Sequence, residues 1–209
     1  MIRALGLATL LALVLTGCSN LAPDKPVRPT LYDLGPAPAA TSAVAPDALP
    51  LVLSDVDVSG SLDSSALMYR LGYADPNQLR AYALARWSTQ PAQLVRQRLR
   101  EVLGRDRPVL DAGSAASLAR RTGVSHRVLR VEVEDFSHHF ETAAASQGVV
   151  RMRCTLLENT PAGERLLAQR TFHVQRPAPT PDAPGGVRAI AAATDAAAAD
   201  IAAWLQQQK

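Results

Sequence analysis

The sequence predicts an α/β fold: a single domain in which a mixed, largely antiparallel sheet carries two main helices packed on it. Segments in which apolar and polar residues alternate recur along the chain, as is typical of strands with one buried face. Two longer segments place apolar residues at helical spacing. The chain has 209 residues, a usual length for one domain with a tether. A sheet covered by a few helices satisfies these patterns together.

Four strand candidates precede the first helix. Their apolar residues are bounded by turn residues such as Gly35, Pro36 and Pro76. An Ala/Pro/Ser-rich stretch that runs to about Asp47 separates the first two candidates, and we expect it to be a surface loop. The strands are expected at residues 30–34, 51–58, 66–71 and 78–86.

Two main helices are indicated by apolar stripes that recur every three or four residues. In the first, Pro91 occupies the first turn, where its missing N–H costs no hydrogen bond, and Gly104 ends the helix. The second has an alanine-rich stripe, which allows close approach to a sheet. The expected elements are main helices at 91–103 and 187–207, a short helix at 114–121, a brief strand at 109–110 and a linker at 176–186.

Three consecutive strands are expected before the last helix. Their alternating residues lie at 129–134, 150–156 and 166–174, and the linkers between them suit an antiparallel meander. On the polar face of this meander, we expect Glu132 to pair with Arg151 or Arg153 across neighbouring strands.

Residues 1–17 resemble a lipoprotein signal peptide. Arg3 supplies positive charge, and the apolar stretch after it is shorter than the roughly 20 residues that a membrane-spanning helix needs. The segment ends with a branched apolar residue and two small residues directly before Cys18, the order of the bacterial lipobox. The alternative is an ordinary signal peptide, or a transmembrane anchor, with a chance cysteine.

The lipobox predicts that Cys18 is the lipidation site. Its thiol would accept diacylglycerol, and its amine, freed by cleavage, would take a further acyl chain such as palmitate. Two or more acyl chains anchor a protein stably where one does not. Ser19 in the next position favours sorting to the outer membrane. Residues 18–30 are polar and rich in proline, so we expect a lipidated tether, followed by the folded domain at 31–209.

The charge balance argues against a nucleic-acid-binding protein. There are 22 basic and 19 acidic residues and only 4% aromatic residues, and such proteins usually concentrate basic and stacking side chains on one surface. With Cys18 lipidated, Cys154 has no disulfide partner. It lies among the apolar positions of a strand, where we expect it to be a small core residue.

No catalytic, metal or cofactor site is predicted. Nucleophile-elbow, dinucleotide-binding and Walker patterns are missing. His138, His139 and Glu141 form the only cluster that suggests a metal, but adjacent strand residues point to opposite faces. We expect these residues to lie in a polar hairpin loop. A hydrolase would need a histidine and a nucleophile that the fold brings within hydrogen-bond distance.

One segment concentrates the residue types that dominate protein–protein contacts. Tyrosine, tryptophan and arginine are over-represented in interface hot spots. Residues 68–87 contain four of the chain's nine aromatic residues together with three arginines. The alternative is that these rings fill the core around two strands. The predicted partner-binding residues are Tyr69, Arg70, Tyr73, Tyr82, Arg86 and Trp87.

The same segment resembles the central block of the ABC-type transport auxiliary lipoprotein family. Residues 32–36 resemble the opening strand of this family, and residues 185–205 resemble its closing helix. The matching central residues lie at 68–70, 73–79, 82–83, 85–87, 91–94 and 98–99. The resemblance implies a lipid-anchored protein on the periplasmic face of the outer membrane. It also implies a partner, the Mce-domain protein of an ABC lipid transporter.

The favoured function is therefore a non-enzymatic lipoprotein that docks an Mce-type transport assembly to the outer membrane. One alternative is a lipid-binding carrier that holds an acyl chain in an apolar cavity between sheet and helix. A periplasmic hydrolase is the third hypothesis. The sequence leaves open whether the protein forms a homo-oligomer.

Overall fold

The computed structural model describes residues 27–37, 48–123, 126–160 and 162–208. The predicted signal peptide, Cys18 and most of the predicted tether lie outside this part of the chain. The described residues form a mixed α/β domain of eight strands, three α-helices and one short 3-10 turn. The strands are β1 (Thr30–Tyr32), β2 (Leu51–Val58), β3 (Ala66–Leu71), β4 (Leu79–Trp87), β5 (Val109–Leu110), β6 (Arg127–Phe140), β7 (Ser146–Thr160) and β8 (Gly163–Pro177). The helices are α2 (Pro91–Leu103), α3 (Ala112–Thr122) and α4 (Ala183–Gln207).

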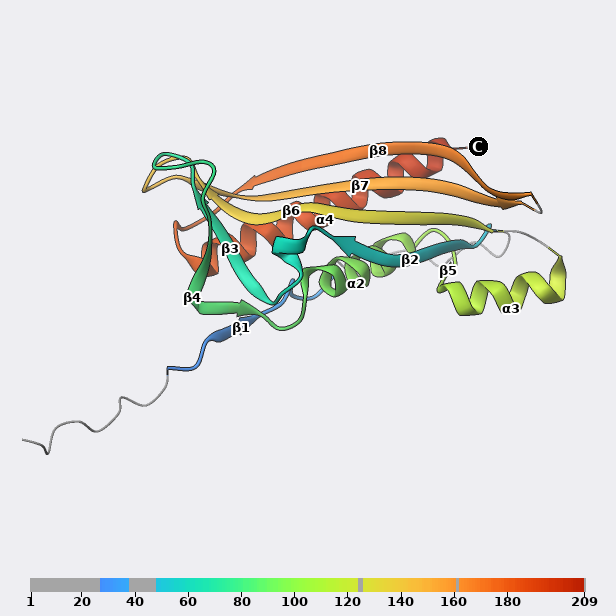
Figure 1. Cartoon of the computed structure of the whole chain (residues 1–209), viewed down its shortest axis with the longest axis horizontal. Coiled ribbons are helices and arrows are strands. Elements are labelled where there is room, and N and C mark those ends of the chain that lie inside the picture. Colours follow the sequence, from blue (N-terminus) through green and yellow to red (C-terminus); the bar gives the residue numbers. More distant parts are fainter. Residues whose placement is uncertain (1–26, 38–47, 124–125, 161, 209) are drawn as a thin grey trace, which may run out of the picture.

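Strand β6 organises the sheet. Along one side it pairs antiparallel with β7, which in turn pairs antiparallel with β8. Along its other side it pairs first with β2 and then with β3, both in the parallel direction. The sheet is completed by the antiparallel pair β3–β4 and by two short parallel strands, β1 beside β4 and β5 beside β2. Figure 1 shows β1, β3 and β4 gathered at one end of the molecule.

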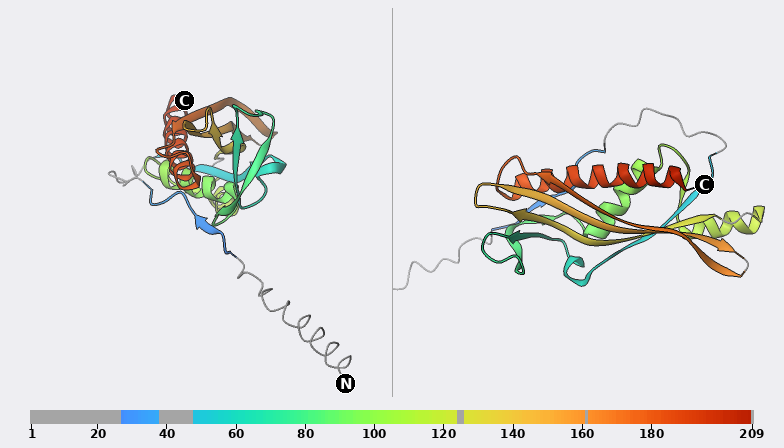
Figure 2. Two further views of the ribbon diagram at one scale, coloured as in Figure 1. Left: turned by 90° about the vertical axis from the view of Figure 1, so that its left-hand side faces the viewer. Right: turned by 90° about the horizontal axis from the view of Figure 1, so that it is seen from above.

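Helices α4 and α2 lie side by side against one face of the curved sheet (Figure 2). Helix α4 packs along β6, β7 and β8, while α2 packs against β2. The alanine-rich face of α4 buries Ile190 and Ile201 completely, together with Phe136 and Met152 of the sheet. Helix α3 packs near β2, and its residue Ala115 belongs to a second, smaller cluster.

Two glycines set how closely α4 approaches the sheet. A Cβ atom on Gly148 of β7 would lie 2.3 Å from the backbone of Ala189, and one on Gly186 would lie 2.4 Å from Nδ1 of His138. Only glycine leaves room for such contacts, because real Cβ atoms do not approach other atoms so closely. The small residues of α4 and β7 therefore bring the helix backbone directly onto the strands.

The elements follow the predicted order, with two corrections. Residues 137–140 were expected in a hairpin loop, but β6 continues to Phe140 and the turn occupies 141–145. The last helix was expected to begin at Val187, but it begins four residues earlier because the carboxylate of Asp182 accepts a hydrogen bond from the Gly185 N–H at 2.7 Å.

The polar face of the meander carries the expected cross-strand ion pairs. Arg153 approaches Glu132 at 3.6 Å and also pairs with Glu134, which accepts a second contact from Arg151 at 2.8 Å. The predicted pairing of Glu132 with Arg153 is confirmed. This face of β6 and β7 is therefore a charged, solvated surface.

Candidate functional site

The described chain enters the folded domain through β1. Val27 is the first described residue, and Thr30–Tyr32 pairs in parallel with the last residues of β4. The N–H of Ser88 donates a hydrogen bond to the carbonyl of Tyr32 at 2.7 Å. The first described residues of the chain therefore lie beside the end of β4.

A buried arginine of α2 fastens this segment to both main helices. The side chain of Arg98 is 2% exposed. Its guanidinium donates to the carbonyls of Leu34 and Gly35 at 2.8 and 2.7 Å, and to the carboxylate of Asp195 on α4 at 2.7 Å. Three acceptors satisfy the cation, so the turn after β1 is held against α2 and α4.

The position of Arg98 in the sequence indicates that it is buried, although the analysis of apolar spacing did not identify it. Arg98 lies on the apolar stripe of α2, four residues after Leu94 and one before Leu99. A charged residue on a buried stripe needs a buried partner. Burial raises the pKa of the Asp195 carboxyl above its ordinary value, although the nearby Arg98 charge opposes the shift.

Two of the six predicted partner-binding residues are plainly exposed. Tyr73, in the turn between β3 and β4, is 52% exposed, and Arg86 lies on the solvent side of β4. Arg70 is partly buried, and its guanidinium donates to the carbonyl of Pro76 at 2.8 Å, which braces the β3–β4 turn. The hairpin therefore presents a tyrosine and an arginine on a stiffened scaffold.

Two further predicted residues have mainly a packing role. The rings of Tyr69 and Tyr82 lie 4.6 Å apart, and the hydroxyl of Tyr82 shares a 2.9 Å hydrogen bond with Nδ1 of His138. Trp87 is only 1% exposed and packs on Phe136, so it belongs to the core. Its prediction as a contact residue needs correction, because a buried ring offers no surface to a partner.

Two exposed leucines complete the surface around the hairpin. Leu31 of β1 is 65% exposed and lies beside Arg86 in the strand register. Leu84 of β4 is 55% exposed, two residues before Arg86 on the same side of the strand. We call Leu31, Tyr73, Leu84 and Arg86 the β1–β4 surface. Sequence reasoning missed both leucines, since leucine in a strand pattern normally indicates the core.

The histidines interpreted as loop residues lie in β6, and His138 is completely buried. Its Nδ1 atom shares the hydrogen bond with Tyr82, and its Nε2 atom has no hydrogen-bond partner. Burial lowers the pKa of His138 from 6.5 to about 4; the charge of His139 adds to this shift and that of Asp182 opposes it. The ring is therefore neutral at pH 7.

We expect stability to fall as the pH drops from 6.5 towards 4. In this window the unfolded chain binds a proton at His138 and the folded chain does not, so folding loses up to roughly 3 kcal/mol. Urea unfolding of the wild type and of His138→Gln between pH 4.5 and 7.5 measures the effect, and the variant should show a flatter profile. His173→Gln, at an exposed histidine of β8, is the matched control. Parallel profiles for wild type and His138→Gln would contradict the prediction.

The fold also brings a histidine and a hydroxyl together. On β6, Oγ of Ser137 lies 2.9 Å from Nε2 of His139 and contacts the carboxylate of Asp135. Burial would raise the pKa of Asp135, but the bonds from His139 and Ser137 outweigh it and the pKa lies below its ordinary value. Ser137 is 0% exposed, so its hydroxyl cannot reach a substrate carbonyl. The trio therefore forms a partly buried polar network.

The space between sheet and α4 is filled. Ala193, Ala197 and Ile201 are 0% exposed, and the helix backbone meets Gly148 directly. Such contact argues against an acyl chain held between sheet and helix. Cys154 is also buried, as predicted, and burial raises the pKa of its thiol.

Two absences apply to the described part of the chain. Within it, no helix combines the length and hydropathy needed to cross a membrane. Nor do the described His, Cys, Asp and Glu residues form a group of three or more that could hold a metal ion.

Comparison with known proteins is consistent with this architecture. The family model described as "ABC-type transport auxiliary lipoprotein component" matches residues 32–202. No curated protein matches the chain.

Solved structures share the fold at low sequence identity. The protein XCC0632 from Xanthomonas campestris aligns with a TM-score of 0.65 and 18% identity, covering 86% of this chain and 96% of that one. An uncharacterised protein aligns with a TM-score of 0.59 and 18% identity, covering 85% and 99%. The hypothetical protein CT253 from Chlamydia trachomatis aligns with a TM-score of 0.50 and 9% identity, covering 78% and 98%.

Proposed function

The chain belongs to the family of ABC-type transport auxiliary lipoprotein components, and from this membership we propose that it docks an Mce-type lipid transport assembly to the outer membrane. In this proposal the protein is not an enzyme. Residues 1–17 are its signal peptide, lipidated Cys18 holds it on the periplasmic face, residues 18–30 are the tether, and 31–209 form the binding domain.

The observation that carries this proposal is the β1–β4 surface. Its leucines are more than half exposed, and Arg86 is the register partner of Leu31, while Tyr73 is exposed in the turn between β3 and β4. Exposed apolar residues next to tyrosine and arginine are typical of protein contacts. The surface includes β1, the strand that follows the tether, so the anchor and the docking surface would share one end of the domain (Figure 1). Partner binding there would hold the Mce-domain protein near the membrane.

Leu84→Asp is expected to reduce recovery of the Mce-domain protein at least about tenfold when the lipoprotein is purified from crosslinked cells. A charge at the centre of a contact removes more than about 1.4 kcal/mol of binding free energy. Leu166→Asp is the matched control, because Leu166 of β8 is 60% exposed and lies outside the β1–β4 surface. Equal recovery with both variants, or no recovery with the wild type, would count against the proposal.

A further inference from the structure

Among the described residues, the outer edge of β2 has a strand neighbour over only a short part of its length. On one side β2 pairs with β6 from Leu51 to Leu53 and again from Val56 to Val58, with a register shift between the two stretches. On the other side β5 covers only Leu51 and Val52, and the described chain places no strand beside residues 53–58. An open edge presents unpaired N–H and C=O groups that can bind another extended chain. Six residues of strand offer about 20 Å of such an edge.

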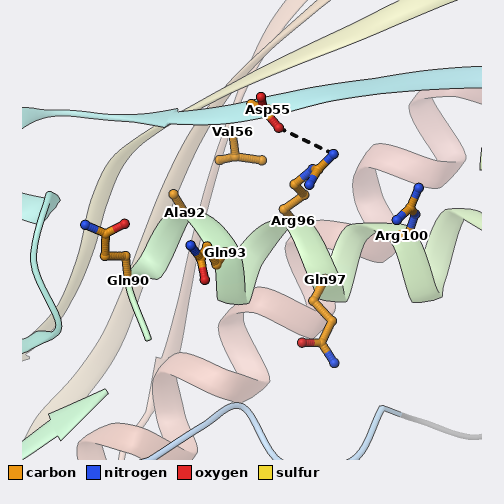
Figure 3. Close-up of a pocket in the computed structure, with 8 residues that line it drawn as sticks. All are labelled: Asp55, Val56, Gln90, Ala92, Gln93, Arg96, Gln97 and Arg100. Carbon is orange, nitrogen blue, oxygen red and sulfur yellow. Dashed lines mark ion pairs between the residues drawn. The ribbon is translucent and has the colours of Figure 1, made fainter. Parts of the chain in front are cut away.

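Helix α2 forms the second wall of a groove along this edge. Figure 3 shows the groove between β2 and α2, with a volume of about 480 Å³. Val56 and Ala92 contribute apolar surface, and the rest of the lining is polar or charged. The residues that line it are Asp55, Val56, Gln90, Ala92, Gln93, Arg96, Gln97 and Arg100. None of them belongs to the β1–β4 surface.

Two arginines of α2 give the groove its charge preference. Arg96 lies 3.4 Å from the carboxylate of Asp55, whose side chain is 91% exposed. Arg100 lies 3.9 Å from Asp111 and is half exposed. Both pairs are loose, so a bound carboxylate can take the place of either acid. Arg96 extends from α2 towards Asp55 on β2, and this ion pair marks where a carboxylate fits (Figure 3).

We propose that this groove binds an extended, acidic segment of a partner protein, which adds a strand to the outer edge of β2. The backbone of the segment pairs with residues 53–58, and its carboxylates contact Arg96 and Arg100. Strand addition provides affinity through main-chain hydrogen bonds, while the helix wall provides selection by charge. This site is a second contact surface, separate from the proposed docking surface.

Synthetic peptides test the proposal on the full-length lipoprotein in detergent. The first probe is a seven-residue peptide of alternating valine and threonine with two glutamates. The second carries lysines in place of the glutamates, and the third carries the glutamates on an N-methylated backbone. Fluorescence anisotropy measures affinity, and hydrogen exchange with mass spectrometry locates binding. We expect only the first peptide to bind, with slower exchange at the amides of 53–58.

Charge reversal on α2 tests whether the peptide binds in this groove and not elsewhere on the surface. The double variant Arg96→Glu, Arg100→Glu should bind the glutamate peptide with an affinity at least tenfold lower than that of the wild type. The control Arg176→Glu, at an exposed arginine of β8, should bind it like the wild type. Four results would overturn the proposal: no binding of the glutamate peptide at millimolar concentration, equal binding of the lysine or N-methylated peptide, protection elsewhere, or protection of 53–58 by a second copy alone.

Discussion

Replacement of Arg98 with alanine is expected to lower the free energy of unfolding by about 3 kcal/mol, since it breaks a buried ion pair and leaves its acceptors unpaired. The variant leaves the carbonyls of Leu34 and Gly35 and the half-buried carboxylate of Asp195 without the guanidinium that satisfies them. It also frees the turn after β1 from both helices. Urea unfolding gives the loss of stability, and limited proteolysis should cut between Leu34 and Leu51 faster than in the wild type.

Arg100→Ala provides the matched control for this experiment. Arg100 lies two residues further along α2, but it is half exposed and its one carboxylate contact is 3.9 Å long. Exposed pairs contribute about 0–1 kcal/mol, so this variant should stay close to wild-type stability. A loss of less than about 1 kcal/mol for Arg98→Ala would show that the buried network contributes little.

Cys18→Ser is expected to abolish lipidation and with it attachment to the outer membrane. Serine has no thiol to accept diacylglycerol, so the precursor should remain uncleaved, held if at all by its signal segment. Transport that depends on the anchored protein should be lost. Mass spectrometry of the N-terminal peptide and separation of inner and outer membranes give the readouts.

Ser19→Ala serves as the control, because it leaves the lipobox cysteine in place. That variant should be processed and acylated normally. If Cys18→Ser were processed normally and stayed in the outer membrane, or if the wild-type N-terminus carried no acyl groups, the lipidation proposal would be wrong.

Local patterns predicted the elements well where one face of each element is buried. The stripe of α2, including Leu94 and Leu99, and the alternation in β6 and β7 each reflect a single buried face. Pairing partners were harder to predict, because a period of two residues shows which face is buried but not which strand lies alongside. The parallel contacts of β6 with β2 and β3 join residues that are far apart in the sequence.

The surroundings of several residues could not be predicted from the sequence, because their neighbours come from distant parts of the chain. His138 resembled a loop residue because histidine is polar, yet Tyr82 on another strand supplies its partner. Trp87 matched an interface composition but fills the core beside Phe136. Leu84 resembled a core residue and is exposed. In each case the residue type was ambiguous, and only the assembled sheet decided its surroundings.

The order of contacts after the tether has a mechanical consequence. If a bound partner pulls the domain away from the membrane, tension enters at Val27 and first loads the three paired residues of β1. The force then reaches the Arg98 guanidinium, which donates hydrogen bonds to the carbonyls of Leu34 and Gly35. Arg98 transmits the force to α2 and, through Asp195, to α4. Strands β6, β7 and β8 come later along this path of contacts. They would therefore carry less of the pulling force than β1 and the Arg98 contacts.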